Sequence, residues 1–433
     1  MNAPRAPLLS LDDALARLLA NVQPLGRTEA VATFDADGRV LAEDVISELQ
    51  VPAFDNSAMD GYAVRSADIP EAGAVLQVTQ RIPAGSDLSG TKPLEALSAA
   101  RIFTGAPIPQ GADAVVMQED CVVVNDSNLD STLRSQGGIR INTLPSKAQH
   151  IRRAGEDVRK GATVLACGTR LSPAELGLAA SVGMANLKVA AKPRVALFST
   201  GDELVMPGEV LPADMKSGSI YNSNRFFLRA LLVRMGCEVT DFGIVPDNRA
   251  ATVEALSSAA SGHDLIVTSG GVSVGEEDHI KPAVQQLGEL NLWQIAMKPG
   301  KPFAFGKIKL GSDPHSFAHF VGLPGNPVSS FVTFLLLVRP LLLQLQGTTS
   351  VAFQPVLLRT DFDWPELGMK ADKRREFLRV RLNCDGGLDL FPNQSSGVLT
   401  SAVWGDGLVD NAAGQTIKRG DMVSYLSFAE FLK

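Results

Sequence analysis

Glycines, hydroxyls and acids are concentrated in residues 264–281, DLIVTSGGVSVGEEDHIK. An apolar run, 265–267, leads into Thr268, Ser269, Gly270 and Gly271, and acids follow at 276–278. Glycines let backbone N–H groups approach an anion, hydroxyls add donors, and neighbouring carboxylates suit a hard cation such as Mg²⁺. The stretch therefore predicts a site for phosphate and metal. The alternative is a strand, turn and helix whose glycines only shape the turn.

Four other segments carry residues of the same kinds. STGDEL (199–204) and VPDN (245–248) each place acids after an apolar run, whereas KPGKP (298–302) and GLPGNPVS (322–329) supply lysines and rigid turns. Phosphate oxygens favour backbone N–H groups and lysine, and a cation that bridges phosphates needs carboxylates. The combination predicts a metal-assisted reaction on a phosphorylated or nucleotidyl ligand. Its members are Asp202, Glu203, Asp247, Asp278, Ser269, Gly270, Gly271, Lys298 and Lys301.

Other common site motifs are missing from the sequence. Neither a GxxxxGK[ST] phosphate loop nor a GxGxxG fingerprint after a strand is present, and no Ser/His/Asp triad stands out among five histidines. His315 and His319 fall in a predicted hairpin and are expected to be structural.

Strand and helix patterns alternate from about residue 192 to 347, and this alternation must position the site. Predicted strands cover 194–198, 238–242, 265–268, 293–297 and 303–305; predicted helices cover 223–235, 250–261, 279–287 and 327–345. Such alternation predicts an open parallel sheet with helices on both faces. Ligands of these sheets bind beyond the carboxyl ends of the strands, where the glycine and acid segments fall.

The flanking regions have different patterns. Residues 11–19 predict an amphipathic helix capped by Ser10, and Ser172 with Pro173 predicts another helix start. Short apolar runs between Gly/Pro turns predict a small β module from 64 to about 150 and a β-barrel or sandwich from 348 to 433. Residues 125–138 are expected to be a polar hairpin without chemistry.

Composition limits the class of protein. The 433 residues are 45% hydrophobic and 20% charged, enough for several folded domains. A formal net charge of −7 argues against a nucleic-acid binding surface. Four scattered cysteines indicate neither disulfides nor zinc, and the apolar segment 331–345 is too short for a membrane span and contains Arg339 and Pro340. We expect a cytoplasmic protein that binds neither nucleic acid nor membrane.

Several polar loops have two interpretations. The loop 52–61 offers Asp60, FTGAP (103–107) offers Thr104, and RRAGEDV (152–158) contains Asp157. Each of them is either a site loop or an ordinary solvated loop. The basic run 373–375 is interpreted as a solvated surface more readily than as an anion site.

The chain closely resembles the molybdopterin molybdenumtransferases of molybdenum-cofactor biosynthesis, the family that includes the E domain of gephyrin. The matching motifs are NSAMDGYA (56–63), FTGAPIP (103–109), RRAGEDV (152–158), STGDEL (199–204), SGGVSVGEEDHIK (269–281), KPGKPFAFG (298–306) and GLPGNPVS (322–329). So many motifs in one order over nearly the whole chain are highly specific.

The resemblance implies a multidomain α/β plus β fold and a homodimer. It assigns a molybdopterin-binding α/β domain with a central parallel sheet to 8–26 and 173–346. A discontinuous linker domain takes 27–48 and 150–172, a β module takes 49–149, and a C-terminal β-barrel takes 347–433. It also implies the reaction, in which molybdate is inserted into adenylylated molybdopterin with Mg²⁺ assistance and AMP leaves. A molybdopterin adenylyltransferase is a possible partner protein.

The resemblance also assigns roles to residues at matching positions. The catalytic set is Asp60, Thr104, Glu203, Asp247 and Asp278, with Asp60 and Thr104 reaching the site from the neighbouring subunit. The metal candidates are Glu203, Asp247 and Asp278. The cofactor-binding set is Ser269, Gly270, Gly271, Ser273, Lys298, Lys301, Pro324, Pro327, Asp157, Arg374 and Ser396. The chain departs from the family pattern at SAVWGDGLV (401–409), close to the last two of these residues.

Two other functions are compatible with parts of the sequence. A molybdopterin adenylyltransferase would match only the α/β portion, and the additional β regions argue against it. A scaffold that binds protein partners, as in the gephyrin branch, is disfavoured because no adenylyltransferase domain or long linker is attached.

Overall fold

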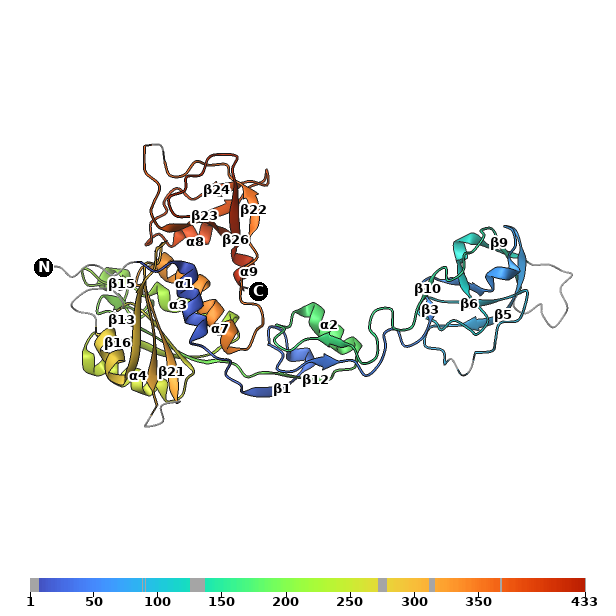
Figure 1. Cartoon of the computed structure of the whole chain (residues 1–433), viewed down its shortest axis with the longest axis horizontal. Helices are drawn as coiled ribbons and strands as arrows, with labels where there is room; N and C mark the ends of the chain where they lie inside the picture. The colour runs from blue at the N-terminus through green and yellow to red at the C-terminus, as the bar shows by residue number, and fades with distance from the viewer. Residues whose placement is uncertain are drawn as a thin grey trace. The chain divides into compact units, whose positions relative to one another are not determined.

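The computed structural model describes residues 8–432 except Leu88, Gly90, 125–136, 272–278, 311–315 and Leu367. The chain forms two compact units (Figure 1). The first unit comprises Met1–Glu43, Cys167–Ser172 and Asn186–Lys433, and the second comprises Asp44–Ala166 and Pro173–Ala185. Each unit is described by itself.

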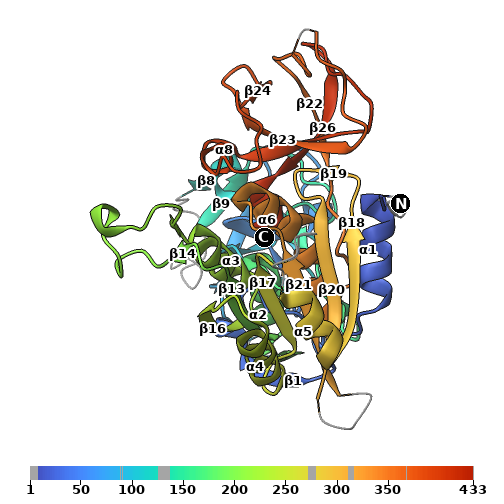
Figure 2. The same cartoon turned by 90° about the vertical axis from the view of Figure 1, so that its left-hand side faces the viewer.

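A six-stranded sheet forms the centre of the first unit. Its strands, in spatial order, are β16 (Glu238–Val245), β13 (Arg194–Thr200), β17 (Leu265–Ser269), β21 (Phe317–Leu323), β20 (Pro302–Lys309) and β18 (Gly288–Gln294). Figure 2 shows them side by side in this order. The first four are mutually parallel, which confirms the α/β class, whereas β20 runs antiparallel to both β21 and β18.

Helices cover both faces of this sheet. One face packs against α1 (Leu11–Ala20), α3 (Ser223–Arg234), α6 (Pro327–Thr333) and α7 (Arg339–Leu345), and the other against α4 (Arg249–Ala260) and α5 (Ile280–Leu287). Strand β13 shows why: Val195 and Leu197 join the first core, while Ala196 and Phe198 join the second. Alternate side chains of a strand point to opposite faces, so a strand buried on both sides is apolar throughout.

Side-chain caps fix three helix starts. Ser10, Asn222 and Asn248 accept hydrogen bonds from the backbone N–H groups of Asp13, Arg225 and Ala251. Such caps satisfy donors that the first turn of a helix leaves unpaired. The predicted cap at Ser10 is confirmed, and the predicted helices 223–235, 250–261 and 279–287 agree with α3, α4 and α5 to within one residue at each end.

The segment Pro327–Leu345 is one continuous apolar helix in which a π-helical turn, Phe334–Val338, separates α6 from α7. It is long and apolar enough to cross a membrane, but 89% of its most apolar window is buried inside the structure. Arg339 is also buried, and its Nε donates to the carbonyl oxygen of Phe431 at 2.8 Å. These contacts are those of a core helix.

A second sheet lies at the C-terminal end of the first unit. It contains β19 (Met297–Lys298), β23 (Arg375–Leu382), β25 (Gly407–Asn411), β26 (Met422–Ser427) and β22 (Val356–Arg359), with β24 (Leu388–Leu390) paired to β23. Helices α8 (Thr400–Trp404) and α9 (Phe428–Leu432) accompany it. Strand β19 precedes β20 in the chain and pairs in parallel with β23, with Lys298 opposite Glu376. This pairing joins the C-terminal sheet to the segment that carries the predicted anion-binding lysines.

The second unit is mainly β. Its largest sheet has the order β7 (Ala114–Met117), β4 (Gly61–Val64), β6 (Ser98–Ile102), β5 (Val75–Ile82), β9 (Gly138–Ile141) and β8 (Cys121–Val124). Two short strand pairs also belong to this unit: β3 (Asn56–Ser57) with β10 (Ile151–Arg152), and β2 (Val45–Ile46) with β11 (Thr163–Leu165). The predicted hairpin 125–138 lies almost wholly outside the described residues.

The remaining strands and α-helices in the described chain are two short strand pairs and one helix. In the first unit they are the pairs β1 (Thr28–Ala32) with β12 (Asn186–Ala190) and β14 (Leu204–Val205) with β15 (Ile220–Tyr221). Helix α2 (Pro173–Ser181) begins where Ser172 and Pro173 predict, and it groups with the second unit. The four-domain boundaries given above stay a prediction.

Candidate active site

A pocket of about 640 Å³ lies at the carboxyl ends of the four parallel strands. Each strand is followed by residues that line it: Gly201 after β13, Asp247 after β16, Gly270 after β17 and Pro324 after β21. Ligands of open α/β sheets bind at this edge. The pocket therefore occupies the place predicted from the sequence.

Two glycines allow the pocket walls to approach closely. Gly270 has φ +97°, and a Cβ there would lie 2.9 Å from the carbonyl oxygen of Thr200. Gly201 has φ +139°, and a Cβ there would lie 2.5 Å from Oε2 of Glu203. Both φ values are strained for a residue with a Cβ, and at Gly270 the Cβ would also meet backbone, so both turns favour glycine.

An asparagine joins two of the strand ends. Nδ2 of Asn224 donates to Oγ of Ser269 at 2.7 Å and to the carbonyl oxygen of Gly325 at 2.7 Å. Asn222 lines the same pocket and is 2% exposed, and its Nδ2 has no hydrogen-bond partner in the described part of the chain. A buried donor of this kind is costly to leave unpaired, so it indicates that a polar ligand group binds there.

Seven of the predicted site residues line this pocket: Glu203, Asp247, Ser269, Gly270, Gly271, Pro324 and Pro327. Oδ1 of Asp202 accepts a hydrogen bond from the backbone N–H of Asp247 at 3.2 Å, so it supports the turn that carries Asp247. Asp278 and Ser273 lie outside the described residues. The structure brings most of the strand-end predictions into one place, and the role of each residue remains a prediction.

Two carboxylates line the described part of the pocket. Glu203 and Asp247 both line the pocket, and no group of three or more His, Cys, Asp or Glu that could hold a metal occurs among the described residues. Mg²⁺ commonly binds through one or two carboxylates together with waters and substrate phosphates. The donor set is compatible with Mg²⁺ held partly by substrate.

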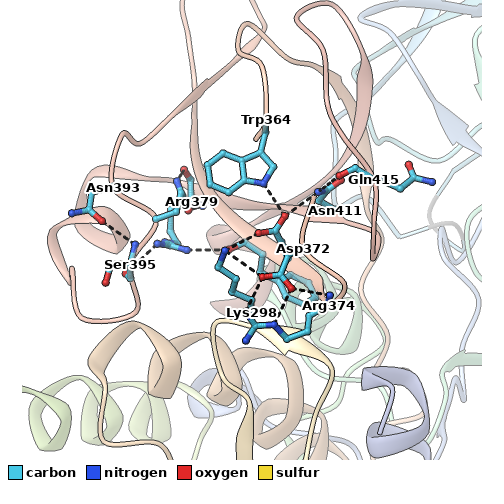
Figure 3. Close-up of polar contacts among 12 residues, drawn as sticks. Lys298, Trp364, Asp372, Arg374, Arg379, Asn393, Ser395, Asn411 and Gln415 are labelled. Carbon is cyan, nitrogen blue, oxygen red and sulfur yellow. Dashed lines mark hydrogen bonds and ion pairs between the residues drawn. The ribbon is translucent and has the colours of Figure 1, made fainter. Parts of the chain in front are cut away.

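Two of the predicted basic residues, Lys298 and Arg374, belong to a separate cluster that also includes Asp372 (Figure 3). Nζ of Lys298 lies 3.1 Å from Oε1 of Glu376 and 3.5 Å from Oδ2 of Asp372. Arg374 contacts both carboxylate oxygens of Asp372, with Nε to Oδ1 at 3.0 Å and NH2 to Oδ2 at 2.7 Å. Arg374 is thus paired with an acid while its side chain stays 32% exposed, and whether the basic run is a solvated surface or an anion site stays a prediction.

The chain neighbours of two other predicted residues, Lys301 and Ser396, line the pocket. Pro302, which follows the partly buried Lys301, lines the pocket, as does Gly397, which follows Ser396. The carbonyl oxygen of Ser396 accepts from the N–H of Val328 at 3.0 Å, which ties its loop to the start of α6. Lys298, Lys301, Arg374 and Ser396 do not themselves line the pocket.

A buried arginine holds the loop that carries Ser396. Arg379 is 1% exposed and donates to the carbonyl oxygens of Phe377 and Ser395 and to Oγ of Ser401. Burial lowers the pKa of Arg379 to about 10. Each of its three guanidinium nitrogens thus has a neutral acceptor, so we assign it a structural role.

Asp60 and Thr104 meet in the second unit. The backbone N–H and Oγ1 of Thr104 donate to Oδ1 of Asp60 at 2.7 and 2.8 Å, and both residues are exposed. The backbone hydrogen bond from Thr104 is the main reason that the pKa of Asp60 is lowered. Asp157 is also exposed, and its N–H donates to the carbonyl oxygen of Val51 at 3.0 Å. The loops of Asp60 and Thr104, residues that are 44 positions apart in the sequence, thus meet and present the ionised carboxylate of Asp60.

Sequence patterns missed Asn222, Asn224, Asp372 and Glu376. Asn222 caps an apolar helix and Asn224 lies in its first turn, so this pattern marks a helix start rather than a ligand contact. The two acids flank a basic run, where they are expected to be solvated. Nothing local in the sequence indicates that Glu376 is 2% exposed.

Comparison with known proteins agrees with this geometry. Three family models match successive parts of the chain: the MoeA N-terminal region (domain I and II) at residues 9–183, the probable molybdopterin binding domain at 196–344, and the MoeA C-terminal region (domain IV) at 367–428. The molybdopterin molybdenumtransferase of Haemophilus influenzae is 46% identical over 340 residues, 78% of each chain. The chain belongs to the molybdopterin molybdenumtransferase family.

Other relatives extend the match over nearly the full length. The molybdopterin molybdenumtransferase of Synechococcus elongatus is 36% identical over 409 residues, 92% of this chain and 93% of its own. A solved molybdopterin biosynthesis MoeA protein from Pyrococcus horikoshii has a TM-score of 0.79 at 27% identity, covering 98% of this chain and all of that one. The matched molybdopterin binding region contains β16, β17 and β21 in full, β13 from Ala196 onward, and every pocket residue except Gly397.

Proposed function

We propose that this transferase inserts molybdate into adenylylated molybdopterin and releases AMP. The observation that carries the proposal is the pocket at the ends of four parallel strands, within the region that matches a probable molybdopterin binding domain. The turn at Ser269, Gly270 and Gly271 offers backbone and hydroxyl donors to an anionic ligand, and Glu203 and Asp247 supply negative charge nearby. This arrangement suits a diphosphate together with a divalent cation.

The chain's own residues have distinct tasks in this proposal. Glu203 and Asp247, with Asp278, would hold Mg²⁺, which supplies charge neutralisation at the diphosphate when bound. Asn222 and Asn224 orient the ligand and the turn that contacts it. Lys298, Lys301, Arg374 and Ser396 form the region that receives the oxyanion.

We also propose that the protein works as a cytoplasmic homodimer. In the dimer, Asp60 and Thr104 act at the site of the neighbouring subunit. An interaction with a molybdopterin adenylyltransferase belongs to the same proposal. The support is the resemblance of the loops NSAMDGYA and FTGAPIP to the family pattern.

The test is AMP release from adenylylated molybdopterin by the purified chain. We expect release to require both molybdate and Mg²⁺, to stop on chelation, and to return when Mg²⁺ is added. We expect Asp247→Asn to lower the rate by at least about 100-fold, since the effect of losing a group that binds the reacting charge is of that order. The exposed Asp214, which does not line the pocket, gives the matched control Asp214→Asn with an unchanged rate.

Other outcomes would identify a different function. Adenylylation of molybdopterin from ATP would indicate an adenylyltransferase, and AMP release without molybdate would rule out the proposed transfer. Binding of adenylylated molybdopterin with no turnover under any of these conditions would favour a scaffold.

A further inference from the structure

The region predicted to receive an oxyanion already contains two carboxylates. Lys298 is within 4 Å of both Glu376 and Asp372, and Arg374 pairs with Asp372. An incoming anion competes with whatever acid holds these cations. The two acids differ in how firmly they are held.

Glu376 is a fixed part of the fold. It is 2% exposed, and besides Lys298 its carboxylate accepts from Nε1 of Trp364 at 2.8 Å and from Nδ2 of Asn411 at 3.4 Å. Its backbone lies in strand β23, opposite Lys298 in β19. Moving this carboxylate would leave buried donors unpaired, so it stays in place and positions Lys298.

Asp372 is held differently. Its side chain is 21% exposed, and its carboxylate contacts only Arg374 and Lys298 among the described residues. Its carbonyl oxygen accepts from the N–H of Gly414 at 2.7 Å, which anchors the backbone. Its Oδ1 also accepts from the backbone N–H of Arg374 at 3.0 Å, a donor that an anion taking the place of the carboxylate inherits. The ion pair keeps contact with solvent, so an incoming anion can reach it and compete for the same cations, which the buried Glu376 does not allow.

The position of Asp372 matches that of an oxyanion. Its two oxygens face the Nε and NH2 groups of Arg374, and Oδ2 also lies 3.5 Å from Nζ of Lys298. Two oxygens that span a guanidinium fork and reach an ammonium are the arrangement that tetrahedral oxyanions adopt with such cations. A carboxylate in this place substitutes for the ligand.

We propose that Asp372 is a displaceable carboxylate that occupies the Lys298–Arg374 oxyanion site and sets which anions enter it. A tetrahedral oxyanion presents enough oxygens to replace both contacts, so it displaces the carboxylate. Chloride offers a single atom and cannot satisfy the fork, so it is excluded while Asp372 is present. The assignment of the site to the anionic substrate rests on the proposed function; the competition by Asp372 rests only on the contacts.

The test measures anion affinity by calorimetry at constant ionic strength, with molybdate, sulfate and chloride as probes. Asp372→Asn should bind molybdate and sulfate about fivefold more tightly than the wild type, because the anion no longer displaces a charged pair that is worth about 1 kcal/mol. Chloride should compete with sulfate in Asp372→Asn and not in the wild type. Unchanged or weaker oxyanion binding in Asp372→Asn would overturn the proposal, and weaker binding would show instead that Asp372 positions Arg374.

The chain provides a matched control in Asp361. Asp361 also pairs with an arginine two residues away, Arg359, whose Nε and NH2 lie 3.2 and 3.1 Å from the two carboxylate oxygens. The Asp361 side chain is likewise 21% exposed. Its remaining side-chain bond goes to Asn383, not to Lys298. Asp361→Asn should leave all three anion affinities unchanged; an equal gain in this variant would attribute the effect to net charge and reject the proposal.

The two proposals fail separately. Molybdate-dependent AMP release with no gain in affinity in Asp372→Asn rejects the displaceable carboxylate and leaves the transferase function intact. A gain in sulfate affinity without any molybdate-dependent AMP release supports the displaceable carboxylate and rejects the proposed function.

Discussion

Asn224 shows how one side chain can organise a binding site. Its amide group links the turn after β17, through Ser269, with the turn after β21, through Gly325. These turns form neighbouring walls of the pocket. The residue is 8% exposed, so water cannot readily replace these bonds.

We predict that Asn224→Ala weakens both the fold and the site. Loss of two buried hydrogen bonds should lower the free energy of unfolding by about 1–3 kcal/mol and weaken binding of adenylylated molybdopterin about tenfold or more. Urea unfolding and fluorescence titration measure the two effects.

Gln346 provides the control for this prediction. It is 7% exposed and donates to two backbone carbonyls, those of Met235 and Leu342, but it does not line the pocket. Gln346→Ala should lose similar stability and keep wild-type affinity. An equal loss of affinity in both variants would show that Asn224 acts only through stability.

The sequence predicts some of the site residues and not others. Ser269, Gly270 and Gly271 could be found because glycines and acids directly after an apolar strand are typical of ligand-binding turns in α/β sheets. Asn224 could not, since it lies in the first turn of a helix that Asn222 caps, and no local pattern marks its contacts with two distant turns. Asp372 also escaped, because its significance depends on Lys298, which is 74 positions away and adjacent only through the pairing of β19 with β23.

At the scale of elements, the apolar helix Pro327–Leu345 illustrates a second limit. The sequence predicts its length correctly but does not predict the π-helical turn at Phe334–Val338. Pro340 lacks an N–H and its ring crowds the preceding turn, and a wider turn relieves this conflict. The site depends on the helix because Pro327 and Ser329, at its start, line the pocket.

Strand β21 contains a buried histidine, His319, which we expect to lower the free energy of unfolding at acid pH. The ring lies between Phe305 and Phe317, and Nδ1 has no hydrogen-bond partner in the described structure. Burial, helped by the positive charge of Lys307 and opposed by Asp264, lowers the pKa of His319 to about 4. The neutral ring is therefore the form that the fold accepts.

The sign of the pH dependence follows from this lowered pKa. In the unfolded chain the histidine takes up a proton near pH 6.5, whereas the native chain excludes it until about pH 4. The neutral ring of His319 therefore contributes about 3 kcal/mol to the free energy of unfolding. This contribution is complete above about pH 6.5 and is lost progressively as the pH falls to about 4. Urea midpoints measured from pH 7 to pH 4 should fall less steeply in His319→Phe than in the wild type.

His263 supplies the comparison for this experiment. It also packs against a phenylalanine, Phe242, but its Nδ1 has a polar partner, the carbonyl oxygen of Ala259 at 2.7 Å. His263→Phe should retain the wild-type slope. Equal slopes in His319→Phe and the wild type would mean that other groups cause the acid sensitivity.

At the scale of the whole molecule, the predicted class was confirmed while the assembly was not tested. Alternating strand and helix patterns reveal an α/β sheet because the periodicity of buried side chains is local. They do not reveal the antiparallel β18 and β20, since strand direction depends on pairing between distant segments. Assembly into a dimer depends on the surface of a partner chain, and the sequence contains no comparable local pattern that reveals it.

The homodimer proposal has a direct genetic and biochemical consequence. If Asp60 serves the site of the neighbouring subunit, a chain with Asp60→Ala and a chain with Asp247→Ala have complementary defects. A mixed dimer then contains one site with both residues intact and one site that lacks both.

We therefore predict that two inactive variants recover activity when they are mixed and allowed to exchange subunits. Random exchange makes half of the dimers mixed, and one of their two sites is intact, so activity should reach about a quarter of the wild-type rate. Molybdate-dependent AMP release after co-refolding or co-expression measures this recovery. The control mixes Asp247→Ala with Glu203→Ala, both changed in the same pocket of the first unit, and should stay inactive. Recovery in the first mixture alone would require active sites built from two chains. Mass spectrometry verifies that subunits have exchanged. If they have and no activity returns, Asp60 and Asp247 do not act together at a site shared between two chains, and the proposal is rejected.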